Sequence, residues 1–87
     1  MLFLIASAPD TPEFKTAIQM AGDARANVCL LQNAVYAAKT PGNDKLYVLT
    51  DDMKLRGLSE DKISGIPIDY DRLVDLMIHA DKVVGLF

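Results

Sequence analysis

The sequence is poor in the side chains that carry most enzymatic and metal chemistry. It has one cysteine, Cys29, and one histidine, His79, and the two fall on separate predicted elements. A nucleophile needs a base within hydrogen-bond reach, so no catalytic triad is predicted. His, Cys, Asp or Glu ligands at metal-binding spacing are also missing, so we expect no metal and no cofactor. A single cysteine excludes an internal disulfide.

Other absences narrow the class of protein. The five glycines are scattered and form no loop of the kind that cradles phosphate. The net charge is −3 without any cluster of lysine or arginine, which argues against direct nucleic-acid binding. No apolar run approaches the ~20 residues that cross a bilayer, so we expect no membrane contact. Met1–Ala6 lacks the basic region and the cleavage site of a signal peptide, and we expect a cytoplasmic location.

The chain is hydrophobic for its size. A single domain over residues 1–87 buries only roughly 60–65% of the surface that its unfolded chain exposes. Because 51% of the residues are hydrophobic, we expect part of the apolar surface to lie against another subunit. Residues 82–87 are almost free of polar side chains, and Tyr36, Leu86 and Phe87 are candidate interface residues. The isolated chain is therefore expected to form a homo-oligomer.

Apolar segments alternate with helical patterns along the chain. Strands are predicted at residues 1–6, 28–31, 45–50, 66–68 and 82–87. The short segment 66–68 contains a proline, which places it at an edge of the sheet. Helix starts are predicted at four capping residues, Thr11, Asn33, Asp51 and Asp69. The alternation predicts an α/β fold with a mainly parallel sheet of about five strands and helices on both faces.

The segment Asn27–Lys39 is the centre of this pattern. Here a strand runs directly into a helix, and α/β folds place their sites where strands end and helix N–H groups are unpaired. Gln32 and Asn33 lie at that junction and are candidates for a ligand-binding turn. Cys29 lies mid-strand, where we predict a core residue; a second hypothesis makes it a persulfide carrier.

Three ordered segments resemble the DsrH/TusB-like family of sulfur-relay proteins. Leu30–Ala38 is similar to the family's L-Q-D-G-V-x-A-A, with Asn33-Ala34 in place of Asp-Gly. Lys45–Leu58 is similar to a strand followed by an acidic turn and A-R-G. Ile68–Leu76 is similar to I-D-Y-x-x-F-V-x-L, and the opening M-L-F-L-I-A-S-A-P also fits.

This resemblance implies a single-domain DsrE-like (Rossmann-like) three-layer fold. It also implies a non-catalytic subunit of a cytoplasmic hexamer, with DsrE/TusD-like and DsrF/TusC-like subunits as partners. Such complexes pass persulfide sulfur toward 2-thiouridine at the tRNA wobble position or act in sulfur oxidation, and the principal cysteine belongs to the DsrE/TusD-type partner. Some DsrH-type members carry a cysteine in the first helix, but the matching stretch around Ala17 has none.

Two alternatives to that function stay open. In the first, the chain is a small sulfurtransferase that uses Cys29 as its persulfide carrier. In the second, it is a homo-oligomeric module that binds a small ligand at the junction of strand and helix. Of the three, the non-catalytic subunit is the function that we predict from the sequence.

Overall fold

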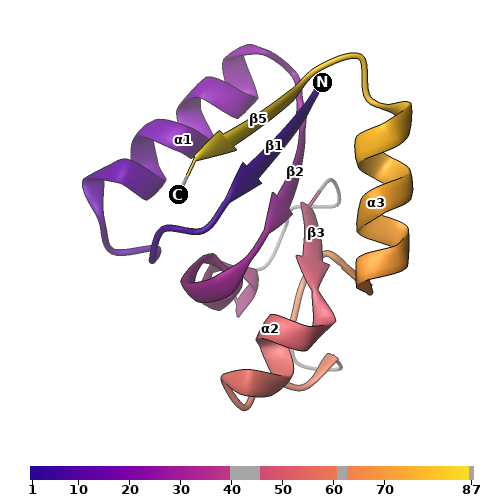
Figure 1. The fold of residues 1–87 in the computed structure, drawn as a ribbon. Coiled ribbons are helices and arrows are strands. Elements are labelled where there is room, and N and C mark those ends of the chain that lie inside the picture. Colours follow the sequence, from indigo (N-terminus) through magenta and orange to yellow (C-terminus); the bar gives the residue numbers. More distant parts are fainter. Residues whose placement is uncertain (40–45, 61–62, 87) are drawn as a thin grey trace.

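The fold is built on one five-stranded parallel sheet (Figure 1). The computed structural model describes residues 1–39, 46–60 and 63–86. The strands are β1 (Leu2–Ile5), β2 (Asn27–Leu30), β3 (Leu46–Leu49), β4 (Ile66–Ile68) and β5 (Val83–Leu86). Their order is β4-β3-β2-β1-β5, and every neighbouring pair is parallel. The predicted α/β class and parallel sheet are confirmed.

Helices cover both faces of the sheet. They are α1 (Pro12–Asp23), the 3₁₀ helix η1 (Gln32–Lys39), α2 (Thr50–Leu55) and α3 (Tyr70–His79). Residues of α1, η1 and α2 join one buried cluster, and residues of α3 join the other. In Figure 1, α1 and α3 lie on opposite sides of the sheet. The chain therefore has the three layers that the sequence predicted.

Side chains of the central strands alternate between the two clusters. In β3, Leu46 and Val48 face the cluster that contains α1, whereas Leu49 faces the cluster that contains α3. In β2, Leu30 belongs to the first cluster and Cys29 to the second, and both are 0% exposed. A strand covered on both faces has no polar side, which explains the continuous apolar run in the sequence.

Two of the predicted helix caps are confirmed. The Phe14 N–H donates to the Thr11 hydroxyl oxygen at 3.2 Å, and Pro12 is the first helical residue. The Arg72 N–H donates to the Asp69 carboxylate at 2.8 Å. In both places the cap and its target lie within one turn, so local sequence is enough to specify them.

The other two predicted caps are wrong. Helix η1 begins at Gln32, one residue before Asn33, and it is a 3₁₀ helix. The Asn33 side-chain oxygen instead accepts a hydrogen bond from Nε of Arg56. Helix α2 begins at Thr50 after Leu49 as N-cap, without a side-chain cap, so Asp51 lies in the first turn and is exposed.

Candidate functional site

A polar network joins the ends of β2 and β3. Asp52, in the first turn of α2, is 8% exposed, and its Oδ2 accepts a 2.7 Å hydrogen bond from the Gln32 N–H. The Arg56 guanidinium donates to the Asp52 carbonyl at 3.2 Å and lies 3.9 Å from Asp52 Oδ1. Its Nε also donates to Asn33 Oδ1 at 3.1 Å. Groups from η1 and from α2 with its C-cap are thus tied together beyond the carboxyl ends of β2 and β3.

This network holds a backbone conformation that the sequence alone does not favour. Gln32 has a φ of +48°, in the left-handed region that residues other than glycine rarely adopt. The Asp52 carboxylate compensates by accepting the Gln32 N–H, which β2 no longer pairs. Because the polar groups at this turn bond to one another, the network stabilises the junction of β2 and η1. The turn at Gln32 and Asn33, which the sequence suggested as a ligand-binding turn, is thus held in place by hydrogen bonds within the chain.

We predict that Asp52→Ala lowers the free energy of unfolding by about 1–2 kcal/mol. The substitution leaves the Gln32 N–H without its acceptor and the Arg56 guanidinium without its carboxylate. Chemical denaturation measures the loss. The matched control is Asp51→Ala, since Asp51 is exposed and adjacent; its effect should stay within about 0.5 kcal/mol. If both variants lose the same free energy of unfolding, the network around Asp52 does not stabilise the fold.

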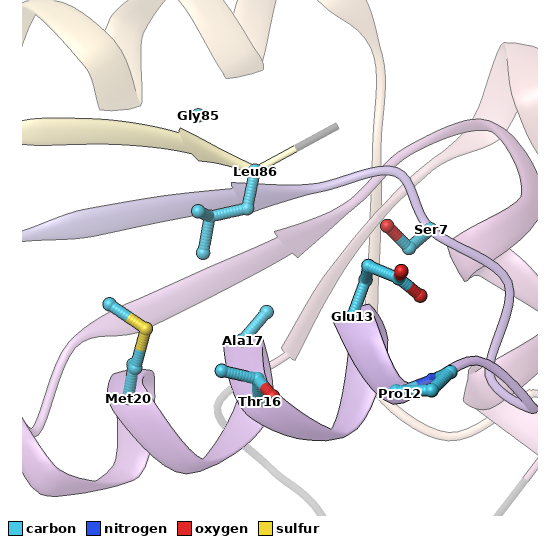
Figure 2. A pocket seen from close by; sticks show the side chains of 8 residues that line it. All are labelled: Ser7, Pro12, Glu13, Thr16, Ala17, Met20, Gly85 and Leu86. Carbon is cyan, nitrogen blue, oxygen red and sulfur yellow. The ribbon is translucent and has the colours of Figure 1, made fainter.

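A separate cavity lies at the point where the strand order changes direction. The chain moves outward from β1 through β2 and β3 to β4 and then returns to place β5 on the other side of β1. Open parallel sheets bind ligands at such a switch point, beyond the carboxyl ends of the strands. The cavity measures about 510 Å³ and is lined by Ser7, Pro12, Glu13, Thr16, Ala17, Met20, Gly85 and Leu86 (Figure 2).

The cavity has a polar and an apolar part. Figure 2 shows Ser7 and Glu13 near the start of α1, while Leu86 points from β5 toward the helix and Met20 lies farther along it. Among the described lining residues none is a cysteine or a histidine. Ala17 lines it, in the stretch where the family resemblance places the cysteine of some members. The walls can hold an apolar group and a hydroxyl or amine, but they offer no thiol.

The chain resembles known proteins both in sequence and in fold. The model of the family described as DsrH-like protein matches residues 6–83. The chain belongs to this DsrH-like family of sulfur-relay proteins. Among solved structures, the solution NMR structure of protein Tm0979 from Thermotoga maritima is similar, with 30% identity and a TM-score of 0.73. That match covers 94% of this chain and 97% of the other. A search of curated proteins gave no significant match.

As a member of this family, the chain keeps its only thiol in the core. The Cys29 side chain is 0% exposed and packs in the cluster under α3, as predicted for a core residue. Burial raises the pKa of Cys29 from 9.0 to about 12, and the nearby Asp52 carboxylate acts in the same direction. At neutral pH the thiol is protonated and out of reach of a persulfide donor. Cys29 also lies outside the lining of the switch-point cavity.

The remaining candidate residues lie at separate places. Gln32 and Asn33 belong to the network with Asp52, and Tyr36 follows them on η1 with 40% of its surface exposed. Leu86 is half-buried at the end of β5 and lines the cavity, whereas Phe87 lies outside the described residues. The structure therefore does not join Tyr36 and Leu86 in one site. The sequence prediction missed Asp52, and the only signal for it was the Asp51-Asp52 pair after a strand.

Among the described residues, no three His, Cys, Asp or Glu side chains are grouped closely enough to hold a metal ion. Of the helices in the described ranges, none combines the length and the apolar character needed to cross a membrane.

Proposed function

We propose that this chain is a non-catalytic subunit of a cytoplasmic sulfur-relay complex, with DsrE/TusD-like and DsrF/TusC-like chains as its partners. Membership of the DsrH-like family supports the sulfur relay. The single observation that carries the non-catalytic role is the burial of Cys29, because a relay thiol must meet its donor and its acceptor in turn. The persulfide is carried by a cysteine of the DsrE/TusD-like partner.

The structure supports a role in which this chain contributes surface and no nucleophile. The switch-point cavity opens beside α1 and β5, with hydroxyl, carboxylate and apolar groups on its walls. Such walls can border a partner's reacting cysteine without reacting with it. The sulfur that the complex delivers is destined for 2-thiouridine at the tRNA wobble position, with sulfur oxidation as the alternative pathway.

The alternative sulfurtransferase requires Cys29 itself to accept sulfur. Its thiolate would attack the outer sulfur of a donor persulfide, form a new S–S bond and release the donor as a thiolate. With a pKa near 12 and no exposed surface, Cys29 meets neither the ionisation nor the access that this attack needs. The ligand-binding module has the cavity as its support, but no bound group identifies a ligand.

The experiment purifies the chain with its interacting proteins from its own cells and loads the complex with a persulfide donor. Mass spectrometry should find the added sulfur on a partner's cysteine and none on Cys29. The Cys29→Ala variant should relay sulfur at the wild-type rate. Sulfur found on Cys29, with loss of transfer in that variant, would establish the sulfurtransferase instead. Purification without any related chain would count against the complex.

A further inference from the structure

Helix α1 ends in a Schellman motif whose glycine position is occupied by Arg25. The Ala26 N–H donates to the Ala21 carbonyl at 2.9 Å, and the Arg25 N–H donates to the Gly22 carbonyl at 3.1 Å. In this pattern the residue after the helix cap takes a left-handed conformation and is usually glycine. Arg25 takes it with a φ of +53°. The backbone therefore closes the helix end by itself, with an arginine in a conformation that suits glycine.

The fold makes no use of the Arg25 side chain. The residue is exposed, and no hydrogen bond or ion pair joins its guanidinium to another of the described residues. A left-handed conformation raises the free energy of the folded chain for any residue with a Cβ atom. Residues held in this way cluster at ligand sites, because the side chain there contributes what glycine cannot.

Arg25 lines a pocket of about 300 Å³ between the end of α1 and the start of the sheet. The bottom of this Arg25 pocket is the pair Val28 of β2 and Leu46 of β3, which are buried and lie side by side in register. Both belong to the cluster on the α1 face of the sheet. The apolar walls come from α1 and from its connection to β2, through Ile18, Ala21 and Ala26.

The Arg25 pocket combines one positive charge with an apolar lining. Among its described lining residues only Arg25 carries a charge, and no other side chain there has a polar atom. A guanidinium presents N–H donors in a planar fork that matches the two oxygens of a carboxylate. The carbonyl oxygens of Met20, Ala21 and Gly22 accept backbone hydrogen bonds, so the helix end is satisfied without the guanidinium. A carboxylate is therefore the group that the guanidinium selects, whereas an amine would meet a like charge.

We propose that the Arg25 pocket binds a small organic monocarboxylate. The carboxylate lies on the Arg25 guanidinium, and an apolar body packs against Val28 and Leu46. Ligand pockets of roughly 300–1,000 Å³ commonly divide their walls in this way, with few polar groups that fix the orientation of the ligand. At about 300 Å³ the pocket suits a body of a few carbon atoms and not a long acyl chain. Arg25 stands in place of glycine because of what its side chain binds.

A structural role for Arg25 predicts the opposite effect on stability. A cation near a helix C-terminus interacts favourably with the helix dipole, and the last turn of α1 contains no basic residue. If Arg25 served the dipole, its replacement by glycine would lower the melting temperature. If it serves a ligand, glycine relieves the left-handed conformation and the melting temperature rises. Only in the second case do stability and binding change in opposite directions.

The Arg25 pocket lies apart from the switch-point cavity. It lies at the amino-terminal ends of β2 and β3, whereas the switch-point cavity lies beyond the carboxyl end of β1. Carboxylate binding there goes beyond the proposed relay function and does not depend on it. A complex that relays sulfur although the chain binds no carboxylate would refute the Arg25 pocket alone. Carboxylate binding by a chain without relay partners would refute the relay alone.

The first test titrates the full chain with hexanoate and follows the backbone amides by NMR. The amides of Arg25, Val28 and Leu46 should shift together, with a dissociation constant on the order of 1 mM. Hexanol and hexylamine carry the same body on a neutral and a positive head group, and each should bind at least about tenfold more weakly. Acetate keeps the head group without the body and should also bind at least about tenfold more weakly. Absence of these shifts with hexanoate, or equal affinity for acetate and hexanoate, overturns the proposal.

The second test replaces Arg25 and measures melting and hexanoate binding on the same samples. Arg25→Gly should melt about 2–5 °C above wild type and should bind hexanoate at least about tenfold more weakly. Arg25→Lys keeps the charge but lacks the planar fork, so it should melt as wild type does and bind about threefold more weakly or less. A lower melting temperature for Arg25→Gly, or wild-type binding in that variant, refutes the role of the guanidinium.

The third test fills the Arg25 pocket from α1. Gly22 lines it, and a Cβ atom built at Gly22 meets nothing within 4 Å. Gly22→Leu should therefore keep the fold, since leucine also favours a helix more than glycine does, and should weaken hexanoate binding about fivefold or more. The matched control is Gln19→Leu, which adds the same side chain at an exposed position of α1 outside the pocket and should bind as wild type does. Equal binding by the two variants would place the carboxylate outside the pocket and refute the proposal.

Discussion

The Gly65→Ala variant is expected to lose about 3 kcal/mol of its free energy of unfolding, as measured by chemical denaturation. Gly65 has a φ of +97°, and a Cβ atom built on it would lie 2.8 Å from the Leu46 carbonyl oxygen. The added atom therefore meets backbone in β3 and also forces a conformation that L-residues rarely adopt. Relief requires β4 to move away from β3, which breaks the edge pairing of the two strands.

Gly57→Ala separates the two contributions to this loss. Gly57 has a φ of +71°, but nothing lies within 4 Å of a Cβ built there. Alanine should cost about 1–2 kcal/mol at this position, from backbone conformation alone. The difference between the two variants then measures the close approach to Leu46. If Gly65→Ala costs no more than Gly57→Ala, β4 does not depend on that approach.

The close approach of Gly65 also explains why β4 forms at all in so short a segment. The preceding residue, Ser64, donates its N–H to the Ala38 carbonyl at 2.7 Å and its hydroxyl to the same oxygen at 3.0 Å. This anchors the segment to η1, and Gly65 then lets it pass directly against β3. Strand propensity alone would not select Ile66–Ile68, because proline and two exposed residues weaken it.

Sequence patterns predicted the layers of this fold well, for physical reasons that can be named. Strands covered on both faces need continuous apolar runs, and β1, β2 and β3 have them. The caps Thr11 and Asp69 are local hydrogen bonds within one helical turn. The connections between successive strands are long enough to contain a helix, and such connections are typical of parallel strands.

The candidate site was harder to predict because its contacts are not local. Asp52 and the Gln32 N–H are 20 residues apart in the sequence, and no periodicity reports such a pair. The left-handed φ of Gln32 could not be predicted either, because glycine is the residue that usually indicates this conformation. Sequence reasoning named Gln32 and Asn33 from the strand–helix junction, but it assigned the cap to the wrong residue.

The switch-point cavity was missed for a related reason. Its lining comes from the end of β1, from α1 and from β5, which are brought together only by the strand order. The sequence predicted five strands without their order, so it could not say that β5 returns beside β1. Once that order is known, the location of the cavity follows from the general rule for open parallel sheets.

Raising the pH above about 9 is expected to destabilise the protein through Cys29. In the folded chain burial raises the pKa of this thiol to about 12, whereas an unfolded cysteine ionises near 9. Below pH 9 the Cys29 thiol is protonated in both the folded and the unfolded chain, so it does not reduce the free energy of unfolding. Between pH 9 and 12 only the unfolded thiol loses its proton, so the free energy of unfolding falls by about 1.4 kcal/mol per pH unit. At pH 11 the ionisation of the unfolded thiol has lowered the free energy of unfolding by about 2–3 kcal/mol.

Thermal or chemical denaturation of wild type and Cys29→Ala across this range isolates the thiol. All other titratable groups are the same in both proteins and cancel in the comparison. The variant starts from a lower stability, because a buried sulfur is removed, and its stability should fall less steeply with pH. Parallel curves would mean that Cys29 ionises as readily in the folded chain as in the unfolded one. A thiol of that kind would be accessible, and the sulfurtransferase would again compete with the non-catalytic subunit.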